Sequence, residues 1–143
     1  MFQERSLCLR ILDTDPDYLF VELRATNGNF AGATDLYLGN EQITEFAACI
    51  DGFPNTPDDT RAYHFGVRGP AVAGGYASLT FRCADRSGRV EIEVEIDGSP
   101  WFDRIEHVIL TLRVESAGVD EFVRQLRKMH EDKSGEAGLP LSQ

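Results

Sequence analysis

Four acidic residues, Glu91, Glu93, Glu95 and Asp97, alternate with aliphatic residues along one predicted strand. Because successive side chains of a strand point to opposite faces, the four carboxylates share one face. The neighbouring strand places Arg82 on that face, and one arginine cannot balance four acids. Two interpretations stay open: a solvated face whose charge discourages edge pairing, or an acidic docking surface for a basic partner.

Acid–base or thiol chemistry would have to use His64, His107 or Cys8. The histidines lack the His-x-x-x-His spacing of a metal site. His64 lies between two aromatic residues of a predicted strand, so its ring faces away from theirs. A thiol nucleophile needs a basic or helix-N-terminal setting, and Cys8 comes nearest because it shares an outward face with Arg10. We expect packed or half-exposed histidines and structural thiols; an enzyme that uses these residues is the competing hypothesis.

Asp13, Asp15 and Asp17 have the spacing of the first three ligands of a calcium loop. Such a loop requires a glycine at its sixth position and a glutamate at its twelfth, where this chain has Tyr18 and Arg24. The sequence also lacks the glycine-rich motifs of nucleotide-binding sites. We therefore predict no metal and no cofactor, and an acidic turn at these aspartates.

The composition sets the class of protein. The chain has 143 residues, of which 42% are apolar and 27% charged, as expected for one globular domain. Its 14 basic and 24 acidic residues give a net charge of −10. This charge argues against nucleic acid and against an anionic membrane surface as partners, because both require clustered lysine and arginine. No apolar run approaches the roughly 20 residues that span a bilayer.

The cysteines and the start of the chain indicate the compartment. Cys8, Cys49 and Cys83 are an odd number and lie far apart, which favours free thiols in a reducing environment. Glu4 and Arg5 stand where a signal peptide would need its apolar stretch. We expect a cytoplasmic protein.

The first strands read with a period of two and form a predicted meander that ends near Leu38. We expect Ile11 to pair with Leu19 across the aspartate-rich turn, and Val21 to pair with Thr34 across the Asn-Gly turn. A fourth strand is predicted from Tyr63 to Val67.

A hairpin and a last strand complete the predicted sheet. Closing Ala84 against Arg89 places Phe81 opposite Ile92 and sets Arg82 beside an acid of the alternating row. The last strand is predicted at 108–114.

Two amphipathic helices are predicted, with Asn40 and Ser116 as N-caps. Their apolar stripes are Ile43, Phe46, Ala47 and Ile50 in the first, and Val119, Phe122, Val123, Leu126 and Met129 or His130 in the second. Residues 133–143 have no periodicity, and we expect a disordered C-terminal tail. The predicted fold is a single α+β domain over 1–132, with a bent antiparallel sheet of about seven strands and two helices.

The order of elements carries a family resemblance between about Asn29 and Met129. Its segments are Phe30-Ala31-Gly32, the helix from Glu41 to Gly52, Gly88-Arg89-Val90-Glu91-Ile92, and the strand and helix from Leu110 to Leu126. This order resembles the WapI-type immunity proteins of bacterial polymorphic toxin systems. The resemblance implies an α+β fold, a cognate toxin as partner and no catalytic residues.

We therefore expect a non-enzymatic protein-binding domain, and the resemblance extends this expectation to an immunity protein that neutralises a toxin. The candidate partner-binding residues are Glu91, Glu93, Glu95 and Asp97, and the expected partner is a basic protein. The alternative is a small cytoplasmic domain that forms a homodimer or is an unrecognised enzyme. Monomer and homodimer both stay open.

Overall fold

The computed structural model describes residues 5–67, 74–98 and 106–142. In chain order its elements are β1 (Arg5–Thr14), β2 (Tyr18–Thr26), β3 (Ala31–Gly39), α1 (Gln42–Ile50), β4 (Thr60–Phe65), β5 (Tyr76–Cys83), β6 (Arg89–Asp97), β7 (His107–Glu115), α2 (Ser116–Asp132) and β8 (Glu136–Pro140). No helix in these residues is long and apolar enough to span a bilayer.

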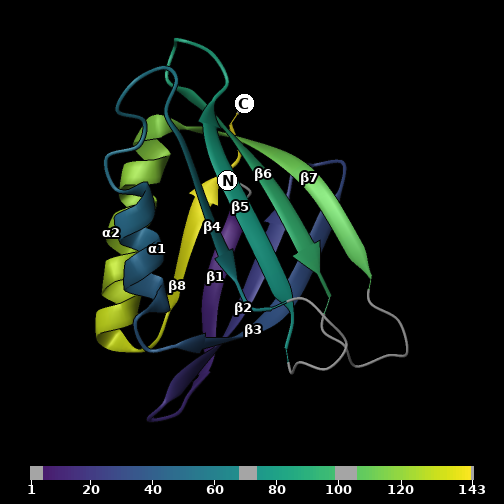
Figure 1. The fold of residues 1–143 in the computed structure, drawn as a ribbon, viewed down its shortest axis with the longest axis vertical. Coiled ribbons are helices and arrows are strands. Elements are labelled where there is room, and N and C mark those ends of the chain that lie inside the picture. Colours follow the sequence, from purple (N-terminus) through teal and green to yellow (C-terminus); the bar gives the residue numbers. More distant parts are fainter. Residues whose placement is uncertain (1–4, 68–73, 99–105, 143) are drawn as a thin grey trace, which may run out of the picture.

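The strands form two antiparallel sheets of four strands each. Sheet A has the order β3-β2-β1-β8 and sheet B the order β4-β5-β6-β7. Figure 1 shows sheet B in front of sheet A, with α1 and α2 side by side along one flank, next to β8 and β4. The predicted α+β class is confirmed, with eight described strands in two sheets in place of one bent sheet of about seven.

The core lies between the two sheets and the helix pair. Phe46 of α1 occupies its centre, and its ring centroid lies 5.2 Å from Phe65, 5.9 Å from Phe122 and 6.3 Å from Phe81. These four rings are fully buried and two of the contacts are edge-to-face, an arrangement that aromatic quadrupoles favour. One side chain of α1 thus joins both helices to sheet B.

Both predicted apolar stripes face this core, and Met129 takes the position left open between it and His130. The predicted N-caps are wrong. Asn40 donates its side-chain amide to the carbonyl of Pro16 at 3.0 Å, and Glu41 occupies the cap position. Ser116 is the first residue of α2. Burial of the apolar stripes therefore determines where the two helices form, and neither helix has a side-chain hydrogen bond at its N-cap.

The predicted register of the hairpin β5–β6 is confirmed. The amide of Ala84 donates to the carbonyl of Arg89 at 2.9 Å, Phe81 pairs with Ile92, and Arg82 pairs with Glu91. A shift of one residue would have turned the apolar side chains of one strand to solvent, so the pattern excludes the registers one residue away.

The predicted registers of the first two hairpins are wrong by two residues. Ile11 pairs with Val21, because β1 continues to Thr14 and contains a bulge. Val21 pairs with Leu36, because the β2–β3 turn has four residues between Thr26 and Ala31. A shift of two keeps the same side chains inward, so the hydrophobic pattern cannot detect it.

The ends of two predicted elements also differ. β4 stops at Phe65, and Val67 is 67% exposed. The prediction of a disordered tail at 133–143 is wrong, because β8 pairs with β1 and buries Ala137 and Leu139 completely. A turn with Lys133 and Gly135 at positive φ reverses the chain after α2. The partner strand of β8 is the first of the chain, and no local pattern reveals that pairing.

Candidate functional site

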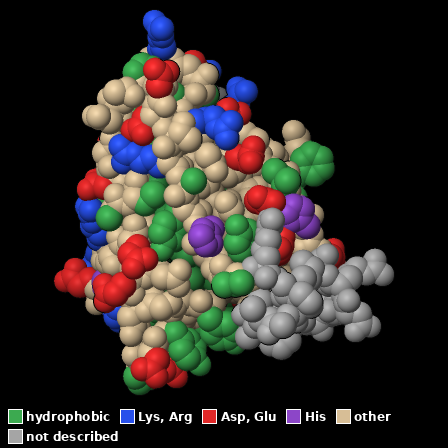
Figure 2. All heavy atoms as spheres, viewed as in Figure 1, with side chains coloured by type: hydrophobic (Ala, Val, Ile, Leu, Met, Phe, Trp, Pro, Cys, Tyr) green, Lys and Arg blue, Asp and Glu red, His purple; other side chains and the backbone are tan. Residues whose placement is uncertain are grey.

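The outer face of sheet B, called the acidic face below, has the acidic row (Glu91, Glu93, Glu95 and Asp97) along its central strand β6. The neighbours of the row are Arg82, Thr80, Ser78 and Tyr76 on β5, and Arg113, Thr111, Ile109 and His107 on β7. Figure 2 looks onto this side of the molecule, where acidic side chains lie among polar and hydrophobic ones. The packing of β6 between two strands places the row at the centre of a sheet.

The two ends of the acidic row meet positive or titratable groups. Glu91 lies between Arg82 of β5 and Arg113 of β7. The sequence predicts Arg82 alone beside the row, and the structure adds Arg113, because β7 lies on the other side of β6. The alternation of residues 107–115 is the signal that could have revealed it.

His107 holds the other end of the row. Its Nδ1 lies 2.5 Å from Oδ1 of Asp97, and its Nε2 lies 3.3 Å from Oε1 of Glu95. Each ring nitrogen of His107 thus faces a carboxylate oxygen of the acidic row. Asp97 is only 9% exposed. Asp97 is therefore the least exposed of the four predicted partner-binding residues, and its carboxylate lies against His107.

The remaining acids differ in exposure. Glu93 is exposed, and Glu91 and Glu95 are half-buried. Glu93 lies between Thr80 and Thr111, whose hydroxyls are uncharged. The centre of the acidic face is therefore a carboxylate without a cation directly across from it on either neighbouring strand.

His64 lies on the same face, at the edge strand β4. Its exposed ring stacks on Tyr76, with the centroids 6.0 Å apart and the planes at 29°. The ladder places His64 beside Ser78, which in turn lies beside Glu95. His64 and His107 thus flank the same end of the acidic face from opposite edges of sheet B.

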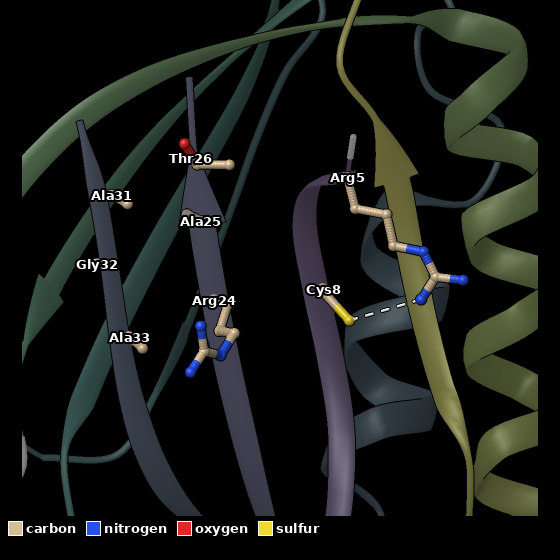
Figure 3. Close-up of a pocket in the computed structure, with 8 residues that line it drawn as sticks. All are labelled: Arg5, Cys8, Arg24, Ala25, Thr26, Ala31, Gly32 and Ala33. Atoms are coloured by element: carbon tan, nitrogen blue, oxygen red, sulfur yellow. Dashed lines mark hydrogen bonds between the residues drawn. The ribbon is translucent and has the colours of Figure 1, made fainter. Parts of the chain in front are cut away.

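Cys8 lies on sheet A, on the far side of the core from both histidines. Figure 3 shows its thiol between Arg24 and Arg5, beside a shallow depression lined by Ala31, Gly32 and Ala33 of β3. Arg5 Nη1 lies 3.8 Å from the Cys8 sulfur. Burial raises the pKa of the Cys8 thiol, although the hydrogen bond from Arg5 opposes this shift. The structure therefore separates the three residues of the competing enzyme hypothesis into two sites.

Two aspartates of the predicted acidic turn accept hydrogen bonds from backbone amides of the turn. Oδ1 of Asp15 accepts the amide of Asp17 at 3.0 Å, and Oδ1 of Asp13 accepts the amide of Thr14 at 2.9 Å. In the part of the chain that the structure describes, no cluster of three or more potential ligands has the geometry of a metal site.

No protein-family model matches the chain, and neither a curated protein nor a solved structure matches it. The functional argument therefore starts from the geometry of the acidic face.

Proposed function

We propose that the protein is a non-enzymatic protein-binding domain that docks a basic partner on the acidic face. The observation that carries the proposal is the exposed outer face of sheet B with Glu93 at its centre. The helices lie on the flank and against the core, so neither helix covers the outer face of β5, β6 and β7.

Charge supports the choice of partner. The net charge of −10 attracts basic molecules at long range, and the acidic row concentrates part of that charge on one strand. Complementary charge of this kind accelerates association and orients the encounter more than it adds final affinity. Glu91, Glu93 and Glu95 are the residues we assign to this role.

The resemblance to WapI-type immunity proteins narrows the proposal. Under that narrower form the basic partner is a cognate toxin, which the protein neutralises by covering it. The resemblance includes Gly88-Arg89-Val90-Glu91-Ile92 at the start of β6, the strand that bears the acidic row.

Affinity capture from the source cell lysate tests the proposal. The variant Glu91→Gln, Glu93→Gln, Glu95→Gln should lose the partner that the wild type captures. A matched control, Asp17→Asn, Asp58→Asn, Glu131→Gln, removes the same charge from exposed positions outside sheet B and should retain it. Equal capture by all three proteins contradicts the proposal. A homodimer would instead appear as a second copy of the chain in sedimentation.

A further inference from the structure

The edge of sheet B beside the acidic face carries backbone groups that none of the described strands covers. Among the strands that the structure describes, β7 pairs with β6 alone. The amide of Gly98 donates to the carbonyl of Glu106 at 2.8 Å, which makes these two residues a hydrogen-bonded pair of the ladder. Because such pairs alternate with non-bonded ones, the backbone groups of His107, Ile109, Thr111 and Arg113 point away from β6.

Other parts of the chain cover one half of this edge. The carbonyl of Arg113 accepts the amide of Ser142 at 2.8 Å. The carbonyl of Thr111 accepts the side-chain amide of Asn27 at 3.3 Å. Both contacts confirm the direction in which the odd-numbered residues of β7 point.

The other half of the edge is open. Within residues 5–67, 74–98 and 106–142, the N–H and C=O of Ile109 have no hydrogen-bond partner. Its side chain is 57% exposed on the acidic face. An edge with free backbone groups and an exposed apolar side chain is a template for another strand.

The remaining edges differ from this one. α2 covers β8, where Gln125 accepts the amide of Gly138 at 2.8 Å. α1 covers β4, where Cys49 contacts the carbonyl of Ala62. The backbone groups of Ala31 and Ala33 at the edge of β3 have no partner among the described residues. The side chain next to them on β2 is Arg24, whose positive charge would repel a basic partner.

We propose that an extended basic segment of the partner adds to the open edge of β7 as a further strand of sheet B. This inference rests on the proposed function and names the form of its partner. The basic side chains alternate, so they share the face of the acidic row. Their alkyl stems cover Ile109, and their charged heads reach over β7 to Glu93 and Glu95.

Charge selects this occupant over a second copy of the chain. Antiparallel pairing of two β7 edges would bring together two molecules that each carry a net charge of −10. A lysine-bearing or arginine-bearing strand meets the same edge with opposite charge.

The test uses a blocked peptide in which four lysines alternate with three valines. Spermine serves as the second probe, because it has four positive charges and no peptide backbone. Binding of the peptide should slow hydrogen exchange at the Ile109 amide and shift the amide resonances of His107, Ile109 and Thr111. Spermine should leave the exchange of that amide unchanged.

Two variants separate edge pairing from charge. Ile109→Pro removes the outward N–H and no hydrogen bond of the β6–β7 ladder, so we expect at least about a tenfold loss of peptide affinity. Ile109→Thr keeps that N–H and should lose no more than about threefold. Spermine should bind the wild type and both variants alike.

The following outcomes would overturn the inference. If Ile109→Pro binds the peptide as the wild type does, or Ile109 exchange is unaffected in the wild-type complex, strand addition fails. A loss of peptide binding in Glu93→Gln, Glu95→Gln would then still support the acidic face. If the peptide does not bind, both proposals fail. A dimer in sedimentation that Ile109→Pro abolishes would assign the edge to a second copy. Should Ile109→Pro not fold, the exchange measurement on the wild type decides.

Discussion

At the scale of single residues, His107 distinguishes one end of the acidic row from the rest, because it contacts two of the four acids. It lies between Asp97 and Glu95, and its side chain is 41% exposed. The contact joins the start of β7 to the end of β6 and leaves little of the Asp97 side chain exposed. The docking role that we propose therefore rests on the three glutamates of the row.

We expect His107→Gln to destabilise the protein by about 1–3 kcal/mol, because a mostly buried Asp97 would lose the imidazole nitrogen that its carboxylate contacts. The free energy of unfolding in urea measures this loss. His64→Gln is the matched control, since it removes an exposed ring stacked on Tyr76 and should cost less than about 0.5 kcal/mol. Equal losses in the two variants would contradict the structural role of His107.

Cys8 provides a prediction of pH dependence. Burial raises the pKa of its thiol above the ordinary value in the folded state. At neutral pH the thiol is protonated in both states, and above the ordinary pKa the unfolded thiol ionises first. The contribution of Cys8 to stability is therefore present below the ordinary pKa and is lost as pH rises through the folded pKa.

Urea unfolding between about pH 7 and pH 10 checks the sign. The free energy of unfolding of the wild type should fall with pH more steeply than that of Cys8→Ala. Parallel curves, or a steeper fall in the variant, would show that the thiol does not titrate as its burial implies.

At the scale of elements, the sequence predicts a strand register only against shifts by an odd number of residues. It also predicts pairing between neighbouring strands better than pairing between strands far apart in the chain. The β5–β6 register was predictable because a shift of one residue would expose Phe81 and Ile92. In the first two hairpins a shift of two conserves the inward face, so the register there depends on the bulge in β1 and on the length of the β2–β3 turn, which the hydrophobic pattern does not predict. β8 has only two inward side chains, Ala137 and Leu139, and pairs with the other end of the chain.

The packing of α2 gives a prediction for one element. Leu126 is fully buried on the apolar stripe of this helix. Leu126→Ala should cost about 2–5 kcal/mol, from lost burial and from the cavity left behind. Urea unfolding measures the loss, and the exposed Lys128→Ala should change stability by less than about 0.5 kcal/mol. A loss under about 0.5 kcal/mol for Leu126→Ala would mean that α2 does not dock on the core.

Removal of β8 tests its place in the fold. A chain that ends at Gly135 loses the strand that covers the edge of β1, together with the buried side chain of Leu139. We expect a lower urea midpoint and self-association, because the edge of β1 becomes available for pairing. Sedimentation and urea unfolding report the two effects. A monomer with an unchanged midpoint would contradict this place of β8 and favour the disordered tail that the sequence predicts.

At the scale of the whole molecule, the fold presents two different outer faces. The outer face of sheet A bears Arg5, Arg10 and Arg24, each beside a glutamate within 3.5 Å. The outer face of sheet B bears the acidic row, of which the buried Asp97 and the half-buried Glu95 meet His107. The same architecture thus keeps charges paired on one side and exposes Glu93 on the other. This asymmetry, within a chain of net charge −10, is what favours a basic partner.

The rate of association with the captured partner tests the acidic face most directly. We predict that the association rate constant of the wild type falls as salt rises from about 0.15 M to 1 M, where the Debye length shrinks from about 8 Å to about 3 Å. At the lower salt concentration, Glu91→Gln, Glu93→Gln, Glu95→Gln should associate more slowly than the wild type. The control Asp17→Asn, Asp58→Asn, Glu131→Gln should stay close to the wild type. Equal rates for the wild type and the triple glutamine variant, independent of salt, would contradict a docking role for the acidic face.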